Sequence, residues 1–179
     1  ADTGATPNVV LVTAKISDGT NALASDQSFT GTTDGAAPVI SSVAPSASSI
    51  VKVADVGYTL SEAITSGTVT YTRTAGSADV TTHTQSLSGT ELNTGARSLA
   101  ALASAPTLVD GAVYTITFNA TDAAGNAATT VNVVNVTFDT TTPTVTLTKS
   151  GADLIVKDAD TETITATFNE DMTSPPTIS

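Results

Sequence analysis

The chain of 179 residues contains no cysteine and no tryptophan, and only one histidine and one methionine. The absence of cysteine excludes disulfide bonds, zinc sites built on thiolates, cysteine nucleophiles and haem attached through cysteine pairs. Aromatic residues make up 4% of the chain and charged residues 13%, whereas 40% of the residues are hydrophobic. We therefore expect a folded chain whose core is built mainly from valine, isoleucine, leucine and alanine.

Positive charge is also scarce, because 6 lysines and arginines stand against 17 aspartates and glutamates, which gives a net charge of −11. An acidic chain without a basic patch repels phosphate backbones and anionic lipid headgroups. No apolar run reaches the roughly 18 residues of a membrane span, and Ala1 does not open a signal-peptide pattern. We expect a soluble piece of a longer protein, with no nucleic acid as partner and no membrane insertion.

Motifs for catalysis are missing as well. His83 lies in a polar, strand-like segment, and no serine nucleophile pattern such as GxSxG accompanies it. A glycosidase site would need a cleft lined by aromatic platforms, which so few aromatic residues cannot easily supply. The scattered glycines form no phosphate-binding loop. We therefore expect that the protein is not an enzyme.

An internal repeat is the most informative feature that the sequence does contain. Three pairs of segments match, namely 37–41 with 142–146 at an offset of 105, 58–62 with 166–170 at 108, and 14–21 with 118–126 at 104 to 105. Such spacing is typical of tandem modules. It predicts the last strands of one repeat in 1–35, a complete repeat in 36–139 and the first strands of a following repeat in 140–179.

Alternation of β-branched and polar residues predicts strands within the complete repeat. The clearest case is 113–120, where Tyr114, Ile116, Phe118 and Ala120 share one face. The other expected strands are 38–44 with 49–53, 56–61, 67–74, 82–87, 96–103 and 129–138. Propensity would also allow a helical turn over 98–103, but we predict a strand. Seven short strands in about 100 residues predict an all-β, two-sheet antiparallel sandwich.

The segment from Asp110-Gly111 through Tyr114 to Gly125-Asn126, followed by the linker 139–143, resembles the bacterial immunoglobulin-like repeats of large surface adhesins and surface-layer proteins. The resemblance covers essentially the whole chain. It implies a seven-strand sandwich, secretion, head-to-tail arrays and, in several branches of the family, calcium between modules. Tyr114 stands where a tyrosine corner would lie. The first, partial repeat has Val10 in that place, so the repeats have diverged.

Strand polarity in such a sandwich predicts a cluster of oxygen ligands where the chain enters the complete repeat. The second-to-third and sixth-to-seventh strand connections meet at that pole, which brings Glu62 close to Asp122 and Asn126, with Asp34 in the entering linker. Carboxylate and amide oxygens are the ligands that calcium takes, six to eight at a time. Aspartate and asparagine also stabilise hairpin turns without a metal, so turn chemistry is the alternative explanation.

The opposite pole offers a second candidate calcium site. Asp55 and Asp110 lie in loops beside the linker through which the chain leaves, and Asp139 is expected to meet Glu170 and Asp171 of the following repeat. A divalent ion at either junction would replace repulsion between carboxylates by a clamp that fixes the angle between modules.

The expected function is that of a non-catalytic spacer in a long extracellular protein at the cell surface, an adhesin stalk whose partners are neighbouring immunoglobulin-like repeats. The alternatives are a segment of a surface-layer lattice with divalent-ion contacts, and an accessory binding module of a secreted polysaccharide-degrading enzyme, which the lack of an aromatic platform disfavours. The incomplete repeats in 1–35 and 140–179 cannot bury both faces of a sandwich alone. Because exposed sheet edges invite pairing, we expect the tail of one chain to complement the head of another.

Overall fold

The computed structural model describes residues 8–14, 19–20, 27–97, 102–151, 161–172 and 174–177. Its regular structure consists of strands β1 to β12 and one 3-10 turn, η1 (Gly89–Leu92). The chain forms two compact units, Ala1–Thr140 and Thr141–Ser179. No helix among the described residues is long and apolar enough to cross a membrane. Because the described regular structure consists almost entirely of strands, most of them paired antiparallel, the predicted all-β class with antiparallel sheets is confirmed.

The larger sheet of the first unit has the strand order β4-β10-β9-β6-β7. Its strands are β4 (Ile50–Val51), β10 (Val131–Phe138), β9 (Ala112–Thr121), β6 (Ser66–Gly76) and β7 (His83–Ser86). All pairs are antiparallel except β4 with β10, which run parallel. The long β6 and β9 form the centre of this sheet.

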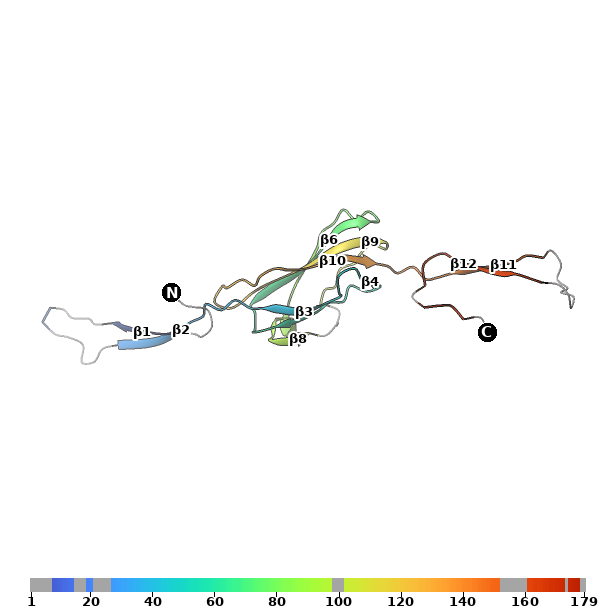
Figure 1. The fold of residues 1–179 in the computed structure, drawn as a ribbon. Helices are drawn as coiled ribbons and strands as arrows, with labels where there is room; N and C mark the ends of the chain where they lie inside the picture. The colour runs from blue at the N-terminus through green and yellow to red at the C-terminus, as the bar shows by residue number, and fades with distance from the viewer. Residues whose placement is uncertain are drawn as a thin grey trace. The chain divides into compact units, whose positions relative to one another are not determined.

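The smaller sheet has the order β3-β5-β8, with β3 (Ile40–Ala44), β5 (Gly57–Leu60) and β8 (Gly95–Arg97) paired antiparallel. Figure 1 shows β3 and β8 on one side of the central region and β6, β9 and β10 on the other. Buried side chains of both sheets belong to one hydrophobic cluster. The two sheets therefore bury a common core between them.

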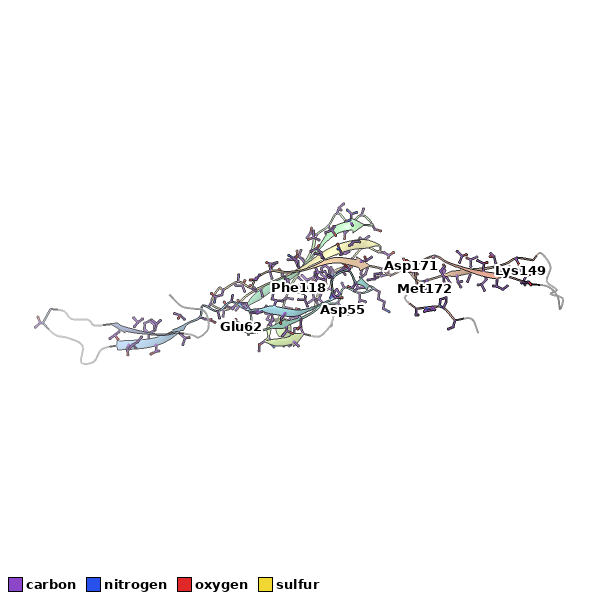
Figure 2. All side chains as sticks on the ribbon, in the orientation of Figure 1. Asp55, Glu62, Phe118, Lys149, Asp171 and Met172 are labelled. Atoms are coloured by element: carbon purple, nitrogen blue, oxygen red, sulfur yellow. The ribbon has the colours of Figure 1, made fainter. Side chains whose placement is uncertain are left out.

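Alternation along β9 positions the centre of that core. Burial alternates along all ten residues of the strand, so that Tyr114, Ile116 and Phe118 are each at most 2% exposed. The ring of Phe118 meets that of Tyr58 on β5 at a centroid distance of 6.1 Å, in an edge-to-face arrangement. In Figure 2 the Phe118 side chain lies between the ribbons of the two sheets. The predicted inward face of 113–120 is thus the core face.

Buried tyrosines also connect the core to the loops. Tyr71 donates its hydroxyl hydrogen to Ala54 O at 2.9 Å, and Tyr58 donates to Glu91 O at 2.9 Å. Burial, and to a lesser degree the nearby carboxylate of Glu91, raise the pKa of Tyr58 to about 12. Both phenols therefore stay neutral donors across the physiological range.

Most observed strands differ from the predicted ones by one or two residues at their ends, and the larger departures are the following. Residues 36–139 hold eight strands rather than seven, because β3 and β4 pair in different sheets. The predicted strand 96–103 is wrong at its end: β8 stops at Arg97, and 102–103 are not strand. Residues 98–101, where a helical turn was the alternative, lie outside the described part. The 3-10 turn comes earlier, at 89–92, where the Glu91 carboxylate accepts the Ser88 N–H at 2.7 Å.

Two hairpins complete the described strands. The leading hairpin pairs β1 (Asn8–Ala14) with β2 (Gln27–Thr33), and the trailing hairpin pairs β11 (Val145–Lys149) with β12 (Ile164–Phe168), each as a two-stranded antiparallel sheet. The leading hairpin belongs to the first compact unit and the trailing hairpin to the second.

Candidate metal site

The carboxylate of Asp122 organises the loop that joins β9 to β10. Its Oδ1 accepts the backbone N–H of Ala124 at 2.9 Å and that of Asn126 at 2.8 Å, while Oδ2 accepts Asn126 Nδ2 at 2.8 Å. The residue is only 3% exposed. Gly125, at φ +93°, provides the left-handed step that this tight loop requires. The turn chemistry expected of an Asp and an Asn in a hairpin tip is therefore present.

Opposing effects act on the pKa of Asp122. Burial favours the neutral acid and raises the pKa, but the hydrogen bonds from Asn126, Ala124 and Gly125 to the carboxylate outweigh it. The net effect lowers the pKa, so the group is ionised at neutral pH. A buried negative charge therefore lies at this pole of the two sheets.

Two further carboxylates meet Asp122. Glu62 follows the end of β5 and is partly exposed, and Asp34 follows the end of β2 and is exposed. One oxygen from each of Asp34, Glu62 and Asp122 lies within 4.8 Å of the others. Figure 2 labels Glu62 at this place on the central sheets. The structure thus brings together three acids from separate parts of the sequence, as strand polarity predicted.

Asn126 links the cluster to the segment that enters the sheets. Its Nδ2 donates to Asp34 O at 3.1 Å as well as to the Asp122 carboxylate. The Asp34 carboxylate accepts the N–H of Ala36 at 3.1 Å, two residues further on. Because Nδ2 makes these bonds, Oδ1 of Asn126 is the atom of that amide with acceptor capacity left for a ligand.

Burial and the neighbouring carboxylates both act on the pKa of Glu62. Partial burial, followed by the negative charges of Asp34 and Asp122, raises the pKa of Glu62 above its ordinary value. The donor set of three carboxylates and one amide oxygen fits a hard divalent cation such as calcium. The residues present are therefore compatible with the predicted ion, although turn chemistry accounts for Asp122 and Asn126 without it.

The candidate calcium ligands of the opposite pole, Asp110, Asp139, Glu170 and Asp171, do not form a cluster like that of Asp34, Glu62 and Asp122 among the described residues. Asp110 Oδ1 accepts both the N–H and the hydroxyl of Thr140, at 2.5 and 2.8 Å, and the N–H of Asp139 donates to Val51 O at 2.9 Å. Glu170 and Asp171 follow β12 in the second unit. Within the described residues, no cluster of three acids includes any of these four. A metal site at this pole stays a prediction.

A second polar network, around Asp79, was not predicted from the sequence. Asp79 Oδ2 accepts the hydroxyl of Tyr114 at 2.7 Å and lies 2.8 Å from His83 Nε2, and Oδ1 accepts the N–H of Thr81 at 2.9 Å. These hydrogen bonds, that from Tyr114 first, lower the pKa of Asp79 to about 2. The pairing of β6 with β9 brings Tyr114 close to Asp79, and the sequence does not show this register. The only local sequence feature of the network is the Asp-x-Thr turn at 79–81, in which Asp79 accepts the N–H of Thr81.

No protein-family model, curated protein or solved structure matches the chain. Function is therefore inferred from the strand topology, the internal repeat and the acidic cluster.

Proposed function

We propose that the chain is a non-catalytic structural segment of a long extracellular protein, built from immunoglobulin-like modules in tandem and stiffened by calcium at their junctions. An adhesin stalk is the form of this function that we favour. The net charge of −11 without a basic patch suits an exposed, solvated surface. Two structural observations and the acidic cluster support the proposal.

The strand order of residues 36–139 supports an immunoglobulin-like module. The neighbouring strands β10-β9-β6-β7 follow the order G-F-C-C′ of a variable-type sheet, and β3-β5-β8 follow the order A-B-E of the sheet opposite. The hydroxyl of Tyr114 on β9 accepts the N–H of Val109, five residues upstream, at 3.0 Å. This backbone contact is the one that a tyrosine corner makes at the start of strand F.

The hairpin registers carry the proposal of tandem modules. In the leading hairpin Ala14 pairs with Gln27, and in the central sheet Phe118 pairs with Val131, each residue 104 positions further along the chain. The same offset relates every pair from there to Val12 with Phe29, whose counterpart is Ile116 with Val133. Beyond these pairs β10 has a register shift that β2 lacks, so the offset between β2 and β10 becomes 105 while that between β1 and β9 stays 104. The leading hairpin thus corresponds to β9–β10.

The trailing hairpin corresponds in the same way to β3–β5. Val145 pairs with Phe168 as Ile40 pairs with Leu60, at offsets of 105 and 108. The hydrogen bonds at the hairpin ends also correspond. The N–H of Val39 donates to Ser61 Oγ at 2.8 Å, and the N–H of Thr144 donates to Asn169 Oδ1 at 2.6 Å. Backbone bonds in the reverse direction, from Ser61 to Val39 and from Asn169 to Thr144, accompany both.

The acidic cluster suggests how a junction is stiffened. Asp34 lies in the segment that enters the module, whereas Glu62 and Asp122 lie in loops of the two sheets. These three carboxylates would hold calcium together with Oδ1 of Asn126. A bound calcium ion supplies the positive charge that offsets their mutual repulsion. Attraction of all three groups to one point would fix the entering segment against both sheets, so the segment would lose freedom to bend.

Calcium titration of the melting temperature tests this role. We expect calcium to raise the melting temperature, by a stabilisation of about 2.7 kcal/mol when its concentration is a hundredfold above the dissociation constant. Glu62→Gln should weaken calcium binding at least tenfold. The matched control is Asp55→Asn, which removes the same charge outside the cluster (Figure 2) and should leave the titration unchanged.

Small-angle scattering supplies the second readout, since a stiffened junction should extend the particle when calcium is added. A melting temperature and a scattering profile that are both insensitive to a chelator would refute the calcium clamp. An equal loss of calcium response in Glu62→Gln and Asp55→Asn would place the ion outside this cluster.

A further inference from the structure

Arg97 is the last residue of β8, the edge strand of the smaller sheet, and its side chain lies on the side of that sheet that faces the core. Its register partner on β5 is Tyr58, and two residues directly opposite each other in an antiparallel pair share one face of the sheet. Tyr58 is 3% exposed and belongs to the hydrophobic core. Figure 1 labels β8 at the margin of the central region. A cation is therefore held on the inner face at this margin.

The guanidinium of Arg97 has no acid as partner among the described residues. Its Nη2 donates to Thr94 O at 2.7 Å, and its Nε is buried without a hydrogen-bond partner. The Glu91 carboxylate instead accepts the N–H of Ser88 at 2.7 Å and that of Ala103 at 2.8 Å. A partly buried charge without a partner lowers stability, so an anion that pairs with Arg97 would offset this cost.

A cavity of about 610 Å³ opens beside Arg97. Val56, Tyr58 and Leu102 form its apolar wall and are 1%, 3% and 7% exposed, whereas Glu91 and Arg97 contribute charged groups. Sites for small molecules are typically of this size, and they combine an apolar wall with a few polar groups that orient the ligand. No member of the acidic cluster lines the cavity, so it is separate from the candidate calcium site.

We propose that this cavity binds a small organic acid, a monocarboxylate with an apolar body. The carboxylate accepts two parallel hydrogen bonds from Nη1 and Nη2 of Arg97, the forked geometry that arginine offers to carboxylates. The apolar body lies against the apolar wall. A single negative charge suits the site better than a doubly charged phosphate, because Glu91 also lines the cavity and no second cation does so among the described residues.

Titration of the full chain with hexanoate, followed by two-dimensional amide NMR, tests the proposal. We expect saturable shifts in the signals of residues 88–91, 95–97 and 102–103, with a dissociation constant in the millimolar range that suits so small a ligand. Affinity should rise about fourfold for each methylene group from butyrate to hexanoate, because each one is buried against the apolar wall. Hexanamide, which has the same body without the charge, should bind at least tenfold more weakly.

Arg97→Gln should weaken hexanoate binding at least tenfold, because it removes the charged donor. The matched control is Arg73→Gln, which removes the same charge from β6, where Arg73 donates to Ser77 O outside the cavity. It should bind hexanoate as wild type does. Ala103 is exposed at the cavity, so Ala103→Trp should narrow the site and weaken binding while Arg97 stays in place. Melting curves by circular dichroism show that each variant is folded.

Wild type without saturable shifts in these signals would overturn the proposal, and Arg97 would then be only an inward charge that protects a sheet edge from pairing. Equal affinity for hexanoate and hexanamide would also overturn it, because the carboxylate would then make no contact with Arg97. So would an equal loss of binding in Arg97→Gln and Arg73→Gln, which would indicate a general effect of net charge. None of these outcomes bears on calcium binding, since the acidic cluster is intact in all variants.

Discussion

The hydroxyl of Tyr114 donates a hydrogen bond of 2.7 Å to Asp79 Oδ2, which joins the middle of the larger sheet to the loop between β6 and β7. The same hydroxyl accepts the N–H of Val109, at the approach to β9. Asp79 in turn accepts from Thr81 and contacts His83. One buried phenol therefore holds two loops that are far apart in the sequence.

Removing this phenol should destabilise the central sheets. Tyr114→Phe keeps the ring but leaves the N–H of Val109 and the Asp79 carboxylate each without one partner. We expect a loss of about 1–3 kcal/mol in the free energy of unfolding, measured by urea denaturation with circular dichroism. Tyr58→Phe is the control and should cost less, because the Tyr58 hydroxyl donates to the neutral acceptor Glu91 O and not to a carboxylate. An unchanged urea midpoint for Tyr114→Phe would contradict this role.

Acid should weaken the fold through Asp79. Its pKa falls from the ordinary 3.8 to about 2 in the folded chain, chiefly through the bond from Tyr114. A carboxylate with a lowered folded pKa contributes stability that is present above its unfolded pKa, and the contribution is lost as pH falls from about 4 toward 2. Asp79→Asn should therefore lower the melting temperature at neutral pH and flatten its decline between pH 4 and 2. Asp122 also has a lowered pKa and is present in both wild type and Asp79→Asn. If the melting temperatures of these two proteins fall in parallel between pH 4 and 2, the acid sensitivity does not come from Asp79.

Glu62 should have the opposite effect on the pH dependence of stability, because its pKa is raised and not lowered in the folded chain. Its pKa is raised by partial burial and by Asp34 and Asp122, so its folded form favours the proton. Stability linked to that proton is present below the unfolded pKa and is lost as pH rises through the raised folded pKa. With a chelator present, Glu62→Gln should melt higher than wild type at neutral pH and should lack this decline. A lower melting temperature for Glu62→Gln under these conditions would show that the ionised carboxylate is stabilising even without a cation.

Short-range patterns in the sequence predicted those features that depend on neighbouring residues. Alternation over 113–120 gave the core face of β9, because sheet pleating alone sets that period. The polarity of successive strands gave the meeting of Asp34, Glu62 and Asp122. The network of Asp79 with Tyr114 could not be foreseen, because it depends on the register of β6 with β9 and on the path of the loop after β6, which strand order and polarity do not determine.

The wrong strand end in 96–103 has a related cause. Leu102 is buried in the core although it lies outside any strand, so an apolar residue at that position imitates strand alternation. A hydrophobic pattern reports burial, and burial in a loop that covers the core gives the same signal as burial in a strand. The 3-10 turn at Gly89–Leu92, between β7 and β8, has no buried residue. It therefore leaves no hydrophobic pattern in the sequence from which it could have been predicted.

Positions that correspond in the proposed tandem modules should differ in their contribution to stability. Ile40 and Val145 are such a pair, but Ile40 is 9% exposed in the core and Val145 is 51% exposed. Ile40→Ala should cost about 2–5 kcal/mol in the free energy of unfolding, because it removes buried methyl groups and leaves a cavity. Val145→Ala should stay within about 0.5 kcal/mol, because the Val145 side chain is half exposed and its truncation leaves no buried cavity. Urea denaturation followed by far-ultraviolet circular dichroism, which reports on the strands of both units, measures both effects. Equal losses of stability would mean that Val145 is as well covered as Ile40, which would contradict the difference in burial on which this prediction depends.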